Sequence, residues 1–123
     1  MEGAKPRQSF PRARRLILPR EFLRVKLEGK ADRGAHLVLG VLKVGESEPR
    51  FRAGFVTSKR LGGAVVRNRV RRRLREIVRK HQGAVTPGVW MVLIARSSAA
   101  NATFAALEDD WLRLANRASI LAP

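Results

Sequence analysis

Arginine side chains are concentrated in one part of the chain, between Lys59 and Lys80. This stretch holds ten of the 26 Lys and Arg residues and a single acid, Glu76. A guanidinium group is a planar, forked donor that matches the oxygen atoms of a phosphate group. The chemistry that such a stretch can perform is therefore the binding of a polyanion, and the excess of arginine over lysine favours phosphate as the ligand.

Helical spacing separates this stretch into two faces. With residues placed about 100° apart, the apolar side chains occupy the width of a core-facing stripe, which consists of Val66, Val70, Leu74, Ile77 and Val78. The opposite wedge, about 60° wide, consists of Asn68, Arg72, Arg75 and Arg79, with Arg69 and Arg71 beside it. Like charges at this spacing repel one another, and a solvated helix usually mixes the two signs. We therefore favour a partner that neutralises this face over simple solvation.

The rest of the chain narrows the class of protein. Residues 1–30 and the arginine-rich stretch carry most of the net charge of +16, whereas residues 81–123 hold as many acids as bases. Such asymmetry points to nucleic acid or an anionic membrane. The chain has no cysteine, no apolar run of the roughly 20 residues that a membrane span needs, and no pattern of a secretory signal. We expect a flexible basic arm at 1–15, one domain at 16–118, a tail at 119–123 and a cytoplasmic location.

Hydrophobic patterns predict the order helix, strand, strand, helix, strand, helix. Residues 16–29 form a short helix with Pro19 in its first turn and Gly29 at its end. Residues 35–44 and 51–58 are expected to pair as an antiparallel hairpin. The basic helix follows from about residue 64, then a buried strand at 88–95 and a last helix from about 103. This order predicts the α/β (α+β) class, a two-layer sandwich with helices packed on a small mixed sheet of about four strands.

No group of residues is arranged for catalysis by the protein itself. The two histidines, His36 and His81, are not accompanied by a nucleophile and an orienting group. No two carboxylates are placed for acid and base roles. Glu108, Asp109 and Asp110 are interpreted as surface acids, and three neighbouring carboxylates alone do not define a metal site. Binding of RNA or DNA is the function that the residues support, with no catalytic or metal-binding residue in the protein.

The segment from Ser58 to Arg75, SKRLGGAVVRNRVRRRLR, resembles the signature of the bacterial ribonuclease P protein subunits. In that family an Arg-Asn-Arg core opens the long helix, preceded by Ala-Val and followed by further cations. Shorter matches are Arg15-Leu16 and Glu21-Phe22 in the first helix, residues 50–58 in the strand before the signature, and residues 92–96 in the last strand. The resemblance covers residues 14–116.

This resemblance implies a function that the residues alone do not give. The catalyst in this family is a large RNA that removes the 5′ leader of precursor tRNA with Mg²⁺, which is held mainly by the RNA. The protein stabilises the active RNA and grips the leader. The implied partners are the ribonuclease P RNA and precursor tRNA, with no membrane and no protein partner. The resemblance also implies a left-handed strand-helix-strand crossover, where the general rule predicts a right-handed one.

The family's functional residues can be carried over position by position. Those on the arginine-rich surface, implied to contact the catalytic RNA, are Lys59, Arg60, Arg67, Asn68, Arg69, Arg71, Arg72, Arg75 and Arg79. Those implied to line a cleft for the single-stranded leader are Phe22, Val25, Lys26, Arg52 and Ser58. Family members usually have aromatic residues where this chain has Lys26 and Gly40, and this chain has no tyrosine. We therefore expect leader binding to depend more on charge than on stacking, and Phe22 to be either a cleft or a core residue.

Three other classes of protein stay open. A structural RNA-binding protein, such as a ribosomal component, would sediment stoichiometrically with ribosomal subunits. A DNA-binding helix-turn-helix module needs two helices three or four residues apart, whereas strands flank the basic helix here. A binder of anionic membranes would insert the apolar side of that helix into lipid, but a folded domain buries that side.

Overall fold

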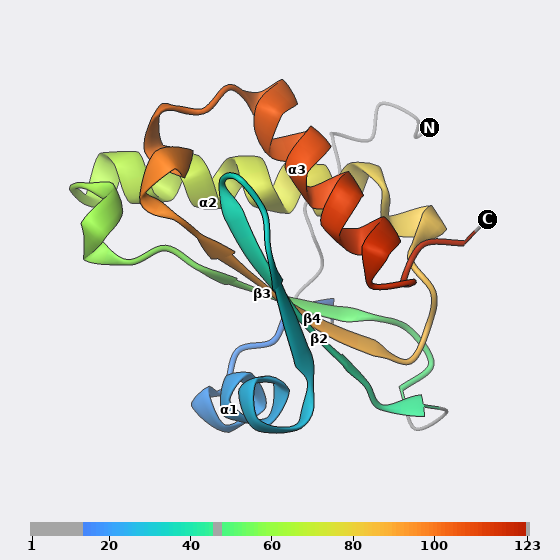
Figure 1. Cartoon of the computed structure of the whole chain (residues 1–123). Helices are drawn as coiled ribbons and strands as arrows, with labels where there is room; N and C mark the ends of the chain where they lie inside the picture. The colour runs from blue at the N-terminus through green and yellow to red at the C-terminus, as the bar shows by residue number, and fades with distance from the viewer. Residues whose placement is uncertain (1–13, 46–47, 123) are drawn as a thin grey trace, which may run out of the picture.

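The computed structural model describes residues 14–45 and 48–122, in which helices pack on both faces of a four-stranded mixed sheet (Figure 1). The strands are β1 (Lys30–Arg33), β2 (Leu37–Lys43), β3 (Arg52–Val56) and β4 (Val89–Ala95). The α-helices are α1 (Pro19–Glu28), α2 (Ala64–Lys80) and α3 (Phe104–Arg117), and short 3₁₀ turns are η3 (Lys59–Leu61), η4 (Gln82–Ala84) and η5 (Ser97–Asn101). The expected α+β class is confirmed. In the described part of the chain, no helix is long and apolar enough to cross a membrane.

The strand order in the sheet is β1-β2-β4-β3. Strand β4 pairs antiparallel with β2 and parallel with β3, so the hairpin expected between residues 35–44 and 51–58 is wrong. Strand β4 is apolar along almost its whole length and takes the interior position, which leaves β3 at one edge. The other edge is β1, which was not expected as a strand because its four residues are polar or small and mostly exposed.

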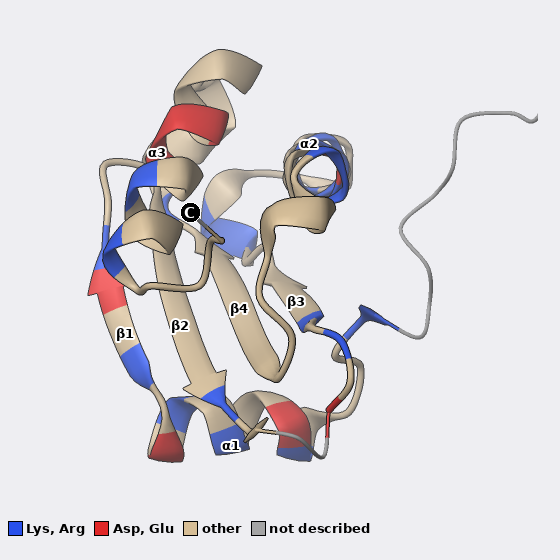
Figure 2. Ribbon diagram, turned by 90° about the vertical axis from the view of Figure 1, so that its right-hand side faces the viewer, with Lys and Arg blue, Asp and Glu red and all other residues tan. Residues whose placement is uncertain are grey.

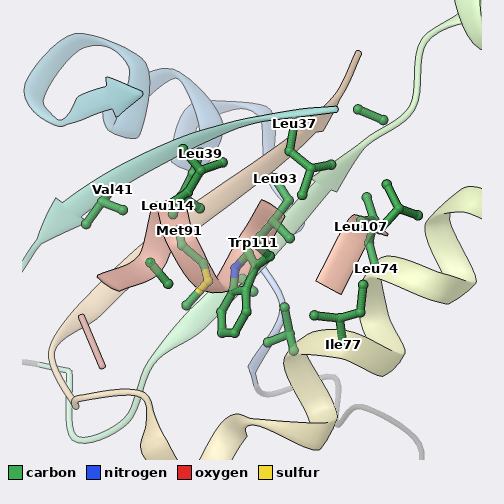
Figure 3. Packing of buried hydrophobic residues seen from close by; sticks show 14 of the residues in the cluster. Leu37, Leu39, Val41, Leu74, Ile77, Met91, Leu93, Leu107, Trp111 and Leu114 are labelled. Atoms are coloured by element: carbon green, nitrogen blue, oxygen red, sulfur yellow. The ribbon is translucent and has the colours of Figure 1, made fainter. Parts of the chain in front are cut away.

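The larger core lies between the sheet and the pair α2 and α3 (Figures 1 and 3). The apolar stripe predicted for α2 is confirmed, because Val70, Leu74, Ile77 and Val78 are fully buried and Val66 packs at its margin. Trp111 of α3 lies at the centre of this cluster. Burial of each such side chain stabilises the fold by about 1.5–3 kcal/mol. The opposite side of α2 is thereby fixed toward the outside of the domain.

Helix α1 covers part of the other face of the sheet (Figure 1). Val25 is only 3% exposed and packs with Leu16 and Val92. Phe22 packs closely over β3, since a Cβ atom added to Gly54 would lie 2.5 Å from Cε1 of Phe22. Glycine at position 54 therefore lets the ring approach the backbone of the sheet.

Glu21 fixes the start of α1. Its Oε1 accepts hydrogen bonds from the backbone N–H groups of Ile17 (2.8 Å) and Leu18 (2.9 Å), and its Oε2 accepts one from Nη1 of Arg52 (2.8 Å). Burial alone would raise the pKa of Glu21, but these hydrogen bonds outweigh burial and hold the pKa below its ordinary value. The ionised carboxylate thus joins α1 to β3.

The lowered pKa of Glu21 predicts a pH dependence of stability. Its contribution is complete above the ordinary glutamate pKa of about 4.3 and is lost as the pH falls through the lower value of the folded state. We expect the free energy of unfolding, measured by urea denaturation between pH 7 and pH 2.5, to fall less steeply in Glu21→Gln than in the natural chain. An unchanged slope would contradict this role. Glu28→Gln, which alters an exposed residue of the same helix, is the matched control.

Asp110 is buried rather than at the surface, so the interpretation of Glu108, Asp109 and Asp110 as surface acids is wrong for this residue. Only 1% of Asp110 is exposed. Its carboxylate accepts hydrogen bonds from three consecutive backbone N–H groups at the start of β2, those of Ala35, His36 and Leu37, at 2.9–3.0 Å. This carboxylate joins α3 to the turn between β1 and β2.

The packed structure extends on both sides of the expected 16–118 domain. Arg15 forms a parallel bridge with Ala53, and the N–H of Leu16 donates to the oxygen of Ala53 at 2.9 Å. At the other end Ile120 is fully buried, and Leu121 forms a bridge with Val85. The remainder of the expected arm, residues 1–13, lies outside the described residues.

Candidate nucleic-acid interface

Helix α2 and the turn before it carry the arginine-rich surface. Leu61 is buried and anchors η3 to the domain, whereas Lys59 and Arg60 beside it are exposed. Gly62 has a φ of 136°, a conformation that favours glycine, and it redirects the chain into α2. Figure 2 views α2 nearly along its axis and shows Lys and Arg over much of its ribbon. The structure thus brings the expected RNA-binding residues onto one helix and the turn that precedes it.

Two arginines of α2 hold the protein's own backbone. Nη2 of Arg69 donates to the carbonyl oxygen of Ala100 at 3.0 Å, and Nη1 of Arg73 donates to that of Ala102 at 3.0 Å. Ala100 lies in η5, and Ala102 lies just after it, before α3. Arg79, in turn, forms an ion pair with Glu76 at 2.5 Å. Arg69 and Arg79, both expected at the RNA surface, therefore also serve contacts within the protein.

Other members of the same surface point outward. Asn68 and Arg72 are exposed, and in the described part of the chain no hydrogen bond or ion pair engages the Arg72 side chain. Arg67 is half-buried, and its Nε has no hydrogen-bond partner among the described residues. This outward set is what a ligand's phosphate groups would meet first.

Arg71 and Arg75 turn toward the edge strand β3. Arg71 donates to Oγ1 of Thr57, just after β3, and to Oδ1 of Asn68 at 3.1 Å. Cζ of Arg75 lies 6.0 Å from the centre of the Phe55 ring. Burial, together with the positive charges of Arg15 and Arg71, lowers the pKa of Arg75 from its ordinary value. The positive surface therefore continues from α2 onto the edge of the sheet.

The residues expected to bind the leader do not form one group. Val25 belongs to the core and is not at the surface, because α1 uses it to pack on the sheet. Phe22 is half-buried, while Lys26 on α1 and Ser58 after β3 are exposed. Arg52 is held by Glu21 and donates to the backbone oxygen of Arg15 at 2.8 Å, so it has a structural role.

Trp90 is an aromatic residue on this face, and the sequence pattern predicts it as a core residue of the buried strand. It is half-buried, with the guanidinium carbons of Arg24 and Arg52 at 5.4 and 5.5 Å from its ring. Its Nε1 donates to Oε1 of Glu48 at 3.0 Å. The apolar run around Trp90 reads as a strand buried on both faces, so no local signal distinguished this residue from its neighbours.

Beyond the end of β3, a surface hollow of about 600 Å³ contains Ser58 and Arg60. Its other lining residues include Arg33, Ile94, Arg96 and Ser98. Nη1 of Arg96 donates to the carbonyl oxygen of Gly34 at 2.6 Å. The hollow combines positive charge with hydroxyl groups and the exposed side chain of Ile94, and its positive charge suits the backbone of a nucleotide chain.

Comparison with known proteins identifies the family of this chain. The family described as Ribonuclease P matches residues 10–119. The ribonuclease P protein component of Gluconacetobacter diazotrophicus is 44% identical over 89% of this chain and 94% of its own length, and that of Roseiflexus castenholzii is 43% identical over 89% of each. The solved structure of the RNase P protein from Thermotoga maritima superposes with a TM-score of 0.75 at 31% identity, covering 84% of this chain and 96% of its own. This chain belongs to the ribonuclease P protein family.

Proposed function

We propose that the chain, as the protein subunit of ribonuclease P, binds the catalytic RNA with α2 and η3 and binds the 5′ leader of precursor tRNA with the α1 side of the sheet. It assists endonucleolytic removal of the leader, and the chemistry is carried by the RNA. The observation that carries this proposal is the division of α2 into a buried apolar stripe and an outward set of cations. Neutralising phosphates with such cations releases counterions and makes binding depend on salt.

The proposed contacts with the catalytic RNA follow the exposure of the side chains. Arg67, Asn68 and Arg72 are the central contacts on α2, with Lys59 and Arg60 at its leading end. Arg71 and Arg75 extend the surface to β3. Arg69 and Arg79 contribute positive charge to this surface, while their N–H groups donate hydrogen bonds to Ala100 and Glu76 within the protein.

The proposed leader site combines stacking with charge. Phe22 and Trp90 supply aromatic surface, and Lys26 and Ser58 supply polar groups at the margin. Aromatic residues in such sites contribute about 1–3 kcal/mol per stacked base. Trp90 thus compensates for the aromatic residues that the family usually has at the positions of Lys26 and Gly40. Val25 is omitted because the core buries it.

We place the Mg²⁺ of this reaction mainly on the RNA. The better-buried carboxylates of the described residues are committed to protein donors: Glu21 to α1 and Arg52, Asp110 to backbone N–H groups, and Glu108 to Lys80 and His81. The protein lowers the Mg²⁺ requirement by screening phosphate repulsion, since its cations replace part of the counterion atmosphere. A cytoplasmic location, where precursor tRNA is processed, is part of the same proposal.

A reconstituted cleavage reaction tests the proposed function. Purified protein is mixed with an in vitro transcribed ribonuclease P RNA and a precursor tRNA with a labelled 5′ leader. At low Mg²⁺ we expect the protein to raise the cleavage rate at least tenfold over RNA alone, and at high Mg²⁺ we expect the difference to shrink. Absence of stimulation, together with stoichiometric sedimentation with ribosomal subunits, would favour a structural RNA-binding protein instead.

A further inference from the structure

Four arginines from two distant parts of the sequence meet along the edge strand β3. Arg14 and Arg15 precede α1, whereas Arg71 and Arg75 are one turn apart on α2. In Figure 2 the chain that follows the grey N-terminal trace runs beside β3, below α2. We call these four residues the β3 arginine row.

The two-residue period of the strand sets the order of the row. Phe51, Ala53, Phe55 and Thr57 alternate with the residues that face α1, and the first three pack with the α2 core. Each arginine of the row contacts one of these positions. Cζ of Arg14 lies 5.0 Å from the Phe51 ring, and the backbone of Arg15 is bridged to Ala53. Arg75 lies over the Phe55 ring, and Arg71 donates a hydrogen bond to Thr57. Alternate residues of a strand are about 6.5–7 Å apart. The four anchoring positions therefore span a line of roughly 20 Å.

Among the described residues, Arg14, Arg71 and Arg75 of this row contact no carboxylate. The hydrogen bonds found for Arg14 and Arg71 go to neutral acceptors, on Gln82, Thr57 and Asn68. Within the described residues, Nε of Arg14 and Nε of Arg75 are buried without a hydrogen-bond partner. Burial and its charged neighbours Arg15 and Arg71 also lower the pKa of Arg75. A line of bound anions would relieve the repulsion between these neighbouring positive charges.

We propose that the β3 arginine row binds consecutive backbone phosphates of one strand of the catalytic RNA. Arg71 and Arg75 belong to the α2 surface that faces this RNA under the proposed function, on which this inference rests. The proposed leader site lies on the other face of the sheet, where α1 packs. The RNA interface is thus continuous from α2 across the edge of β3, and it includes Arg14 and Arg15, which the sequence placed in a flexible arm.

The test compares two pairs of charge-removing substitutions. Arg14→Gln with Arg15→Gln alters the row, and Lys30→Gln with Lys43→Gln removes the same charge near the opposite edge of the sheet. The dissociation constant for an in vitro transcribed ribonuclease P RNA is measured over a series of monovalent salt concentrations at fixed Mg²⁺. For the row variant we expect the slope of log K against log salt to fall by about 1.5–2, and the affinity at 0.15 M salt to fall about 20-fold. The control pair should change the slope by less than half as much.

Thermal unfolding and two further variants keep the result interpretable. Residues 15 and 16 contact Ala53 through their backbone, so the row variant should fold, which thermal unfolding checks. If the pair does not fold, Arg15→Gln alone should lower the slope by about one. A pair of Arg→Lys substitutions at 14 and 15 should recover most of the slope because it restores the charges.

Several results would overturn the inference. The first is that the row variant shows the same salt slope and the same affinity for the catalytic RNA as the control pair. The second is that the row variant loses affinity for leader-bearing precursor tRNA but keeps its affinity for the catalytic RNA. If the natural chain itself does not bind the catalytic RNA, the proposed function fails, and this failure is seen before any variant is compared.

Discussion

Replacing Asp110 with alanine is expected to lower the free energy of unfolding by about 3–5 kcal/mol. The side chain is 1% exposed, and its two oxygens accept hydrogen bonds from the N–H groups of Ala35, His36 and Leu37. Alanine leaves three donors without their acceptor, the N–H of Leu37 buried and those of Ala35 and His36 partly buried, and a buried donor left unpaired costs about 1–3 kcal/mol. Burial would raise the pKa of Asp110, but these N–H groups and Arg113 outweigh it and hold the pKa below its ordinary value, so the carboxylate is charged at neutral pH.

The measurement is urea denaturation followed by circular dichroism at pH 7. Asp109→Ala is the matched control, because Asp109 is the preceding acid of α3 and its side chain is 69% exposed. The control should change stability by less than about 0.5 kcal/mol. Equal stability losses in the two variants would show that the three backbone hydrogen bonds do not stabilise the fold. Gly34→Ala gives a second approach to the same contact, because its Cβ atom would lie 2.4 Å from Oδ1 of Asp110.

The local sequence pattern was sufficient to predict α2 and its two faces, because the residues of its buried side and of its polar side both lie within the helix. The spacing of Val70, Leu74 and Ile77 defines the buried side, and the same period places Asn68 and Arg72 opposite. The resemblance of the Arg-Asn-Arg segment to a known signature then added the functional class, which spacing alone left open among several nucleic-acid binders.

Strand order could not be read in the same way, because it depends on contacts between distant segments. Residues 35–44 and 51–58 are close in sequence and separated by turn residues, which favours a hairpin. In the structure the run Val89–Ala95 lies between them, because its apolar side chains are covered on both faces only in the interior of the sheet. The edge strand Lys30–Arg33 has no apolar alternation to mark it.

For the candidate site as well, the sequence predicted features that depend on neighbouring residues but not those that depend on residues far away in the chain. Arginine spacing identified the surface, but it could not show that Arg69 and Arg73 bind the carbonyl oxygens of Ala100 and Ala102. Backbone carbonyls carry no side-chain signal, and these lie about 30 residues from their donors. Val25 was assigned to a cleft by resemblance, whereas the helix turns it into the sheet. Arg14 and Arg15 were assigned to an arm because nothing in the sequence indicates their contacts with Phe51 and Ala53.

Exchanging Arg72 for glutamate is expected to raise the dissociation constant for the catalytic RNA about 30-fold at 0.15 M salt and to lower the salt slope by about one or more. Loss of one phosphate contact accounts for roughly fivefold at this salt concentration, and repulsion by the new carboxylate adds a similar factor. Because Arg72 is exposed and engages no described residue through a hydrogen bond or ion pair, stability should change by less than about 0.5 kcal/mol.

The neighbouring residue provides the matched contrast for Arg72. Arg73 is half-buried and donates to the oxygen of Ala102, so Arg73→Gln should lower the free energy of unfolding by about 1–2 kcal/mol while changing RNA affinity less than threefold. Filter binding and urea denaturation of both variants separate the two roles. Natural affinity in Arg72→Glu would place the RNA surface elsewhere on the protein. A large affinity loss in Arg73→Gln with unchanged stability would mean that this arginine leaves its carbonyl to bind RNA.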